Sequence, residues 1–436
     1  MLGVGSTGPG VAADASAGPD IGGGASAGSG GPSAMSEREA WAVLTCVDGL
    51  GPVGMVALLH RYGSGVAILT EASGLGGARR LAAPSADTDS TAPPRRPVLP
   101  SVAEAIVVAA QRAPLTLARI NALGLQVVTV ADPVYPARLA AIAMPPHVLF
   151  VLGNPAALGA RDAIAVVGTR RATNAGRTTA ARIATNLVSV GAAVVSGLAT
   201  GIDGAAHAAT IHAGGVTVAV IGSGHAQLHP RIHERLAASI VRSGGAVVSE
   251  LAPDVRPTHG TFPRRNRVIS GLADATVVVE APARSGALIT ASWALEQGRP
   301  CFIVPGSIGA PASAGCLSFL REYAEAGARI VAGIPQLIDD LGLADHLAEP
   351  GVAPAAAATL ADVSDAAARI GRELVRGRAT VDELVAVTGW PVASVLAALT
   401  LLERRGLALG IHGRFRPAGS LAGADPGRGR SRGPGI

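Results

Sequence analysis

The sequence contains no lysine, and all 36 of its basic residues are arginine. Aromatic residues are also few, at 3% of the chain, whereas 49% of the residues are hydrophobic, so a mainly aliphatic core is expected. The abundance of alanine and glycine beside arginine is typical of a GC-rich genome, and the missing lysines therefore exclude nothing by themselves. The formal net charge of +5 permits nucleic-acid binding but does not require it.

Cysteine and long apolar runs are scarce too. Cys46, Cys301 and Cys316 lie far apart, which excludes a disulfide framework and a paired-cysteine metal motif and predicts a reducing, cytoplasmic setting. No apolar run approaches the roughly 20 residues of a membrane-spanning helix, so no membrane span is predicted. Residues 1–34 contain no basic residue and no long apolar stretch, and a secretory signal is therefore not expected.

The signatures of common nucleotide-dependent enzymes are missing as well. There is no G-x-x-x-x-G-K-[ST] segment, which excludes a P-loop ATPase site. No G-x-G-x-x-G follows the first predicted strand of the central region, so ordinary NAD binding is not expected. A serine-nucleophile elbow and a paired-carboxylate site are also lacking. We therefore predict no cofactor and no catalytic residue.

Two polar clusters have alternative interpretations. His225, His229 and His233 have the four-residue spacing of a zinc-binding helix, but Pro230 interrupts it. Asp203 and His207 are one helical turn apart, which would suit a catalytic pair, or an N-cap with the imidazole packed beneath it. The second interpretation is favoured, and no metal site is predicted.

From residue 162 onward, short apolar runs alternate with alanine-rich helical segments. Runs that are continuously apolar are typical of strands buried on both faces, and their alternation with helices predicts a parallel α/β sheet. The predicted strands are Ile164–Val167, Ala193–Ser196, Thr217–Ile221, Ala246–Ser249, Thr276–Glu280, Cys301–Val304 and Arg329–Val331. A further short strand is predicted over Gln126–Val130, after a helix that a capping box at Ser101 to Glu104 begins and Gly124 ends.

The residues that follow these strands share a chemistry. Glycine together with a hydroxyl or an arginine occurs after most of them, as in Gly168-Thr169-Arg170, Ser196-Gly197 and Ser285-Gly286 with Thr290. Ligands of such sheets bind at the carboxyl ends of the strands, where glycine allows close approach and helix N-termini attract anions. Tight turns alone would explain the glycines but not the arginines, so we predict phosphate recognition at this edge.

One stretch, Phe262–Leu272, contains three arginines in four positions, directly before a buried strand. Arg264, Arg265 and Arg267 flank Asn266. Because arginine binds phosphate with two parallel hydrogen bonds, the stretch is predicted to face a polyanion. Asn266 is expected to hold the backbone of this loop so that its neighbours point outward.

The whole chain is predicted to be α/β, with an extended Rossmann-like parallel core between two smaller domains. Its C-terminal part has three helices and a β-hairpin around Gly413, the order of a winged helix. The outer side of the third helix lacks basic and amide residues, so a protein-binding or accessory role is as well supported as base reading.

The predicted segments are a disordered tail over 1–34 (with Met35 as a second candidate start), a helical domain of helix-hairpin-helix or SAM-like type over 35–72, a flexible insertion over 73–100, the Rossmann-like domain over 101–339, a linker over 340–362, the winged helix over 363–418 and a disordered tail over 419–436.

These motifs together resemble the DNA-processing protein A (DprA/Smf) family of bacteria. The resemblance covers roughly residues 125–333. It rests on these segments: Val167-Gly168-Thr169-Arg170, Ser196-Gly197-Leu198-Ala199, Phe262-Pro263 with Arg265-Asn266-Arg267, Ser285-Gly286 with Leu288-Ile289-Thr290, and Pro305-Gly306. The chain departs from the family where His229-Pro230 replaces a Tyr-Pro pair, and again around Gly315–Leu320.

The resemblance implies a homodimeric protein that binds single-stranded DNA without sequence preference. It also implies loading of the RecA recombinase during natural transformation of competent cells, and no enzymatic activity. Phe262 would stack on a base while the arginines bind phosphates. The predicted DNA contacts are Gly168, Thr169, Arg170, Ser196, Gly197, Phe262, Arg264, Arg265, Asn266, Arg267, Ser285, Gly286 and Thr290.

Two rival functions are weighed against this one. Nucleotide phosphoribohydrolases on a related fold resemble the chain in their glycine-rich strand ends, but the run from Pro305 to Ala310 lacks the glutamate of their active site. A structural adaptor with a vestigial pocket is the other rival, and DNA binding by the 125–333 region would exclude it.

Overall fold

The structure, a computed structural model, describes residues 35–83, 98–344, 364–375, 377–411 and 413–421. The predicted N-terminal tail, residues 422–436 of the predicted C-terminal tail, most of the linker and residues 84–97 of the predicted insertion lie outside the described residues. The C-terminal tail was predicted to begin at residue 419, but Gly419–Leu421 form a short 3-10 helix, and Leu421 is buried in the core of the winged helix. The N-terminal part is helical, with α1 (Glu37–Thr45), α2 (Pro52–Tyr62), α3 (Gly65–Ser73), α4 (Gly77–Ala82), α5 (Pro100–Gln111) and α6 (Ala113–Ala122). Its first helix begins at a capping box, in which the side chains of Ser36 and Glu39 each bond the other residue's backbone amide.

Among the described residues, nine strands form one sheet in the order β1-β2-β6-β5-β4-β3-β7-β8-β9. All neighbours from β6 to β9 in this order are parallel, whereas β2 pairs antiparallel with both β1 and β6. The strands are β1 (Gln126–Thr129), β2 (Val148–Gly153), β3 (Ala163–Val167), β4 (Ala193–Ser196), β5 (Thr217–Val220), β6 (Ala246–Ser249), β7 (Ala275–Val278), β8 (Cys301–Ile303) and β9 (Ala328–Ile330). From β3 the chain winds outward through β4, β5 and β6, then returns to β7 on the other side. The order therefore reverses between β3 and β7, the switch point of a doubly wound sheet.

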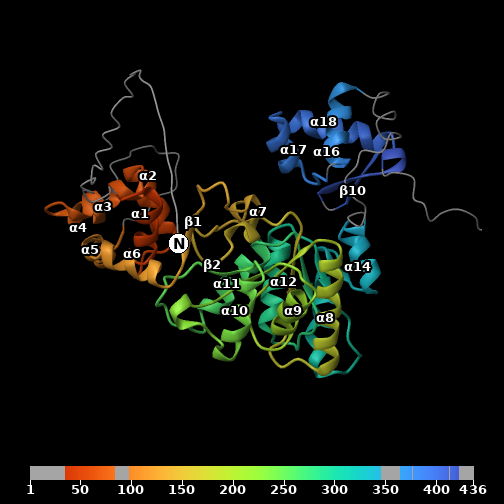
Figure 1. The fold of residues 1–436 in the computed structure, drawn as a ribbon, viewed down its shortest axis with the longest axis horizontal. Helices are drawn as coiled ribbons and strands as arrows, with labels where there is room; N and C mark the ends of the chain where they lie inside the picture. Colours follow the sequence, from red (N-terminus) through yellow and green to blue (C-terminus); the bar gives the residue numbers. More distant parts are fainter. Residues whose placement is uncertain (1–34, 84–97, 345–363, 376, 412, 422–436) are drawn as a thin grey trace, which may run out of the picture. The chain divides into compact units, whose positions relative to one another are not determined.

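Helices cover both faces of this sheet, as the continuous apolar runs predicted. Side chains of β3 alternate between two cores: Ala165 and Val167 face the first, and Ile164 and Val166 face the second. The first core is closed by α7 (Ala137–Ala140), α11 (Thr261–Gly271), α12 (Gly286–Glu296) and α13 (Ala314–Tyr323). The second is closed by α8 (Asn174–Ser189), α9 (Ile202–His212) and α14 (Ile334–Asp340), and α10 (Glu234–Arg242) packs beside β5 and β6. Figure 1 shows α8 and α9 side by side.

The C-terminal part has the predicted three helices and hairpin: α16 (Asp365–Val375), α17 (Val381–Thr388), α18 (Val392–Arg404), β10 (Ala408–Ile411) and β11 (Arg414–Pro417). A capping box of Thr380 and Glu383 begins α17. These elements enclose a hydrophobic core of their own, built on Leu384, Leu399 and Leu402. The architecture is thus an α/β core with a helical region before it and a winged helix after it.

Several local predictions were wrong. The single helix expected from Ser101 to Gly124 is two helices, because Pro114 cannot sit in a helix interior and α6 begins beside it. The capping box at Ser101 does not form, since Pro100 already occupies the first turn of α5. Residues 36–70 contain three helices rather than two, and α4 lies inside the predicted insertion. Strand β2 was missed, because a short apolar run after two prolines does not differ from a buried helical segment in periodicity.

Among the described helices, none is by itself both long and apolar enough to cross a membrane. Two sharply bent helix pairs, α2 with α3 and α17 with α18, reach that length and composition only together.

Candidate functional site

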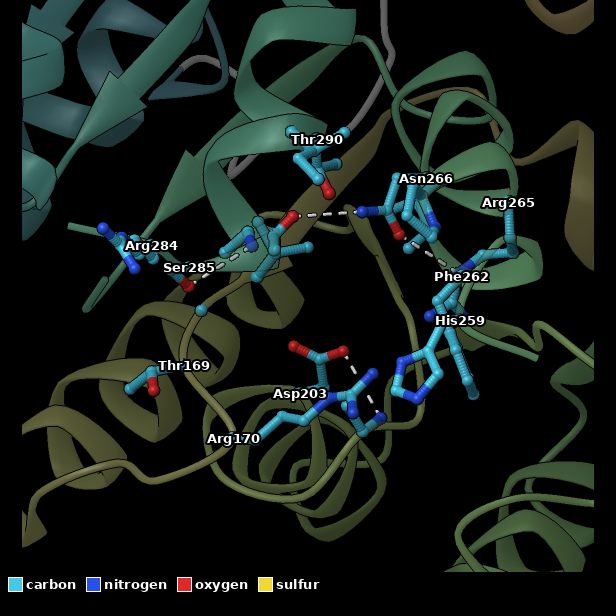
Figure 2. Close-up of a pocket in the computed structure, with 18 of the residues that line it drawn as sticks. Thr169, Arg170, Asp203, His259, Phe262, Arg265, Asn266, Arg284, Ser285 and Thr290 are labelled. Carbon is cyan, nitrogen blue, oxygen red and sulfur yellow. Dashed lines mark hydrogen bonds between the residues drawn. The ribbon is translucent and has the colours of Figure 1, made fainter. Parts of the chain in front are cut away.

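A cleft of about 630 Å³ opens at the switch point of the sheet. Its lining comes from the segments that follow β3, β4, β5, β6 and β7, so residues far apart in sequence meet at the carboxyl ends of the strands (Figure 2). This is where ligands bind in open α/β sheets. The convergence that the strand ends predicted is therefore present in the fold.

One wall of the cleft is the ring of Phe262, in the first turn of α11. The guanidinium carbon of Arg170 lies 5.0 Å from the ring centroid, and the imidazole of His229 lies 5.8 Å from it at 58°. Phe262 is half-buried, while Arg170 and His229 are exposed. A Cβ at Gly222 would come within 2.8 Å of the ring, so glycine there lets Phe262 lie close to the end of β5.

The floor of the cleft holds a buried pair of opposite charges. The Asp203 carboxylate accepts hydrogen bonds from the amides of Gly197, at 3.1 Å, and Ala199, at 3.3 Å. Burial raises the pKa of Asp203, while the positive charge of Arg265 opposes that rise. Arg265 is itself 5% exposed and donates to the carbonyls of Gly197, at 2.9 Å, and Val220. Burial lowers the pKa of Arg265 to about 10, so it stays charged at neutral pH.

The opposite wall is the beginning of α12. Ser285 caps this helix by accepting from the amide of Ala287, and the Asn266 side chain donates to the carbonyl of Gly286 at 3.1 Å. The exposed Arg284 stands just before the cap, and the buried Thr290 lines the cleft one turn into the helix (Figure 2). A helix N-terminus beside an arginine favours an anion.

By contrast, the N-terminus of α8 is already occupied by a carboxylate of the protein and cannot bind an anionic ligand. The carboxylate of Glu280 accepts from the amide of Thr173 at 3.1 Å and from its hydroxyl at 2.6 Å. This acid neutralises the N-terminal end of α8 from within the protein. The positive field of the cleft therefore comes from α12 and from side chains.

Charged side chains give the cleft a positive balance. Arg170, Arg171 and Arg284 are exposed at its rim, whereas Asp203 at the floor is the one acid among its described lining residues. Exposed charges of one sign around a concave surface attract a polyanion. The cleft therefore combines cationic groups, an aromatic ring and backbone donors.

The predicted contact residues divide into two groups. Nine line the cleft: Gly168, Thr169, Arg170, Phe262, Arg265, Asn266, Ser285, Gly286 and Thr290. Ser196 and Gly197 lie beneath it; the Ser196 hydroxyl donates to the carbonyl of Val166 at 2.6 Å, and a Cβ on Gly197 would meet Asp203 and Arg265. Arg267 is 1% exposed and pairs with Glu250 at 2.5 Å, while the exposed Arg264 faces a smaller cavity beside the α1–α2 turn.

The stretch Phe262–Leu272 is a helix rather than the expected loop. Asn266 does not hold a loop in place; it ties α11 to the beginning of α12 and accepts from Arg265 at 3.3 Å. Five ionisable lining residues were not among the predicted contacts: Arg171, Asp203, His229, His259 and Arg284. Arg171 and Arg284 directly adjoin predicted contacts after β3 and β7, which is a usable signal. His229 was considered only for the histidine spacing and as a departure from the family's Tyr-Pro pair, and His259 stands on a loop without any pattern.

The fold separates the three histidines, and Asp203 and His207, although one turn apart on α9, bond different partners. His225 and His233 lie in two different turns, η2 (His225–Gln227) and η3 (Arg231–His233), and bond different carbonyls. Among the described residues, no three potential metal ligands gather. Asp203 is not an N-cap, since Gly201 holds that position and Asp203 accepts from loop amides instead. His207 bonds the Thr217 hydroxyl at 2.7 Å.

Comparison with known proteins gives consistent results. The family model described as DNA recombination-mediator protein A matches residues 126–341, and the DprA winged helix domain model matches residues 354–413. Protein Smf of Escherichia coli K12 is 39% identical over 64% of this chain and 74% of its own length. The putative DNA processing protein DprA of Mycobacterium tuberculosis is 42% identical over 62% of this chain and 68% of its own.

A solved structure agrees in fold. The X-ray structure of DNA processing protein A (DprA) from Streptococcus pneumoniae aligns with a TM-score of 0.55 and 30% identity. The alignment covers 70% of this chain and 98% of that one.

Proposed function

Because the chain belongs to the DNA recombination-mediator protein A family, we propose that its cleft binds single-stranded DNA, without base-sequence preference, in a step of DNA recombination. The observation that carries the proposal is the ring of Phe262 between Arg170 and His229 at the mouth of a positive cleft. Such a ring offers a base a stacking surface, and the neighbouring cation offers a phosphate a charge.

The remaining lining groups suit a sugar-phosphate backbone. Arg170, Arg171 and Arg284 supply exposed charge, and the first amides of α12 add uncharged donors. Contacts of this kind recognise the backbone and carry no sequence information. Binding without sequence preference therefore follows from the chemistry of the lining.

The same geometry favours a single strand over a duplex. A base can stack on Phe262 only if its face is free, and in a duplex that face is covered by the neighbouring base pair. A cleft of about 630 Å³ has the size of a small-molecule pocket and fits one or two nucleotides rather than a double helix.

The proposal is one of binding rather than catalysis. A hydrolytic role would need a free general base near the bound nucleotide. The Asp203 carboxylate is already held by two amides and faces Arg265. Its contacts support a structural role beneath the ligand.

The proposal also includes two binding partners, a second copy of the chain and RecA, and a cytoplasmic location. The family resemblance supports a homodimer that hands single strands to the RecA recombinase during natural transformation. The cysteines Cys46, Cys301 and Cys316 are all unpaired, which suits a reducing cytoplasm. A RecA-nucleation assay on single-stranded DNA tests the transfer step separately from binding.

The binding step is tested with Arg170→Ala combined with Arg284→Ala. Both side chains are exposed, so the fold should be kept while two phosphate contacts are lost. We expect at least roughly tenfold weaker binding of mixed-sequence oligonucleotides, because hydrogen bonds to charged groups contribute about 1.5–3 kcal/mol each. The slope of log K against log salt should fall by about 0.7 for each lost phosphate contact on a single strand.

The matched control is Arg182→Ala combined with Arg235→Ala, which removes the same charge from exposed positions on α8 and α10. Gel shifts with single- and double-stranded oligonucleotides at two salt concentrations measure both variants. If the cleft variant binds as tightly as the control variant, the cleft is not the DNA site. Equal affinity for single and double strands would contradict the stacking role of Phe262.

A further inference from the structure

A second polar cluster lies at the amino ends of the strands, whereas the cleft lies at their carboxyl ends. Asp162 directly precedes β3 and Asp274 directly precedes β7, and these strands are neighbours in parallel register. Their side chains are only 6% and 18% exposed. Two carboxylates that are close together and largely out of water repel each other unless cations accompany them.

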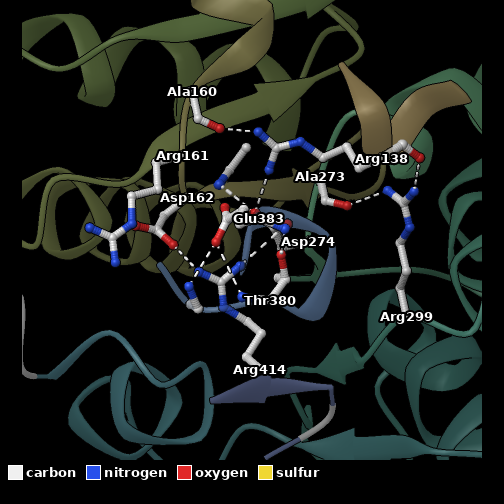
Figure 3. Close-up of polar contacts among 12 residues, drawn as sticks. Arg138, Ala160, Arg161, Asp162, Ala273, Asp274, Arg299, Thr380, Glu383 and Arg414 are labelled. Carbon is white, nitrogen blue, oxygen red and sulfur yellow. Dashed lines mark hydrogen bonds and ion pairs between the residues drawn. The ribbon is translucent and has the colours of Figure 1, made fainter. Parts of the chain in front are cut away.

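The core itself supplies two of these cations, of which Arg161 lies 3.8 Å from Asp162. The guanidinium of Arg138 lies 2.5 Å from Asp274, which also accepts from the amide of Ala163 at 2.9 Å. Arg138 donates further to the carbonyl of Ala160 and is held in place by Arg299, which donates to the carbonyl of Arg138. Figure 3 shows this frame around the two carboxylates.

The third cation comes from the winged helix. Arg414, the first residue of β11, donates to Asp162 and lies 3.4 Å from Asp274 (Figure 3). Its backbone forms an isolated bridge with Thr380, and the next amide, that of Phe415, bonds the carbonyl of Ala379 at 2.6 Å. The side chain is 18% exposed. The hairpin thus presents one arginine to two carboxylates.

Packing around the ion pairs supports the same contact. A Cβ at Gly377, in the turn between α16 and α17, would collide with the guanidinium of Arg161 from the core. Gly377 has a φ of +90°, so glycine there serves both the turn and the close approach. A cavity of about 230 Å³ beside the pairs is lined by the core and by the winged helix together.

We propose that Asp162 and Asp274 form a docking site for the chain's own winged helix, with Arg414 as the residue that holds the hairpin there. Arginine suits this site because its planar guanidinium can bond two carboxylates at once, whereas the ammonium of lysine is a single point charge. While docked, the hairpin cannot present Arg414 to another polyanion. Release of the winged helix frees this arginine and uncovers an acidic site that binds a guanidinium group.

Small-angle scattering of the full chain tests the proposal. Arg414→Ala should shift the largest dimension upward and broaden the distance distribution, because the winged helix leaves the core. Arg414→Lys should shift it in the same direction. The matched control is Arg405→Ala, which removes an exposed arginine at the end of α18, and it should scatter like the unmodified chain.

A change in the core separates docking from folding of the winged helix. Asp162→Asn leaves every residue of the winged helix intact and removes the shorter of the two ion pairs of Arg414. It should shift the largest dimension in the same direction as Arg414→Ala, but less far, because Asp274 still lies 3.4 Å from Arg414. The double variant should shift no further than Arg414→Ala alone, because both changes act on the same contact. The proposal is overturned if Asp162→Asn scatters like the unmodified chain, or if the two shifts add.

Discussion

Arginines that are adjacent in the sequence have different roles in α11. Arg264 is exposed, Arg265 is buried beneath the cleft against Asp203, and Arg267 is buried against Glu250. A buried guanidinium with a carboxylate partner stabilises the fold and is not available to a ligand. Burial rather than charge density therefore decides which arginine can meet DNA.

Arg267 gives the first stability prediction at this scale. Arg267→Met should lower the free energy of unfolding by about 3–5 kcal/mol, because Glu250 would remain largely buried without its cation. Urea unfolding followed by circular dichroism measures the loss. Arg264→Ala, at an exposed position of the same helix, should change stability by less than about 0.5 kcal/mol.

The pair can also be removed as a unit. Arg267→Met combined with Glu250→Gln should recover most of the stability, since no charge is then left without a partner. A single Arg267→Met variant as stable as Arg264→Ala would show that the ion pair contributes nothing to the fold.

The division among the predicted contacts has a simple geometric reason. Consecutive residues of an α-helix point about 100° apart, so Arg264, Arg265, Asn266 and Arg267 cannot all face one cleft. The residues after β3 and β7 were predicted more successfully, because the topology of a parallel sheet alone brings its strand ends together. Glycines and arginines in sequence therefore located the cleft and nine of its lining residues, but not which arginines of α11 face it.

At the scale of elements, the cleft is kept open by a link between α11 and α12. Asn266 donates to the carbonyl of Gly286 and accepts from Arg265, so one amide spans both helices. The positions of Phe262 on α11 and of Arg284 before α12 depend on how these helices are spaced. The link is therefore a positioning contact for the candidate site.

Asn266→Ala tests this role. We expect the free energy of unfolding to fall by about 1–3 kcal/mol, because the buried guanidinium of Arg265 and the carbonyl of Gly286 both lose their partner. DNA affinity should fall less than in the Arg170→Ala, Arg284→Ala variant, since no phosphate contact is removed. Chemical unfolding and gel shifts on the same preparation measure both effects. A loss of affinity with unchanged stability would instead make Asn266 a direct contact.

The elements themselves were predictable to different degrees. Each continuous apolar run from residue 164 onward became a strand of the sheet, because burial on both faces leaves an unambiguous pattern. The break between α5 and α6 at Arg112 was not predicted, because it depends on one proline. Strand β2 was not predicted either, because it depends on pairing with β6, which is almost 100 residues away. Helix α11 was not predicted, because its arginines interrupt the helical spacing of apolar residues to which Val268 and Ile269 belong.

At the scale of the whole molecule, one sheet topology creates both polar sites. The carboxyl ends of β3 and β7 open the cleft, and the amino ends of the same strands hold Asp162 and Asp274. The proposed nucleic-acid binding in the cleft and the proposed docking of the winged helix therefore use separate surfaces. The Arg170→Ala, Arg284→Ala variant should for this reason leave the docked winged helix undisturbed.

The stability of the whole chain should fall as the solution becomes mildly acidic. Burial lowers the pKa of His207 to about 3 and that of His225 to about 4, so both are neutral in the folded protein. Their unfolded pKa is about 6.5, and the unfolded chain therefore binds more protons below that value. The stability that the neutral histidines contribute is fully present above about pH 6.5. As the pH falls from there toward the folded pKa values, the free energy of unfolding decreases by up to about 1.4 kcal/mol per pH unit for each histidine.

His207→Asn isolates one of these contributions. The Thr217 hydroxyl donates to the carbonyl of Val194, so it accepts from Nδ1 of His207, and an asparagine amide can replace that donor. The pKa values of the buried Asp203 and Asp274 are raised, so the stability that these groups contribute is lost as the pH rises, which is the opposite trend. Because both groups are present in the parent protein and in His207→Asn, they do not affect the difference between the two. Urea unfolding at pH 7, 6 and 5 should therefore give a shallower loss for His207→Asn, by up to about 1.4 kcal/mol per pH unit. Parallel losses in the two proteins would show that His207 does not take up the proton on unfolding.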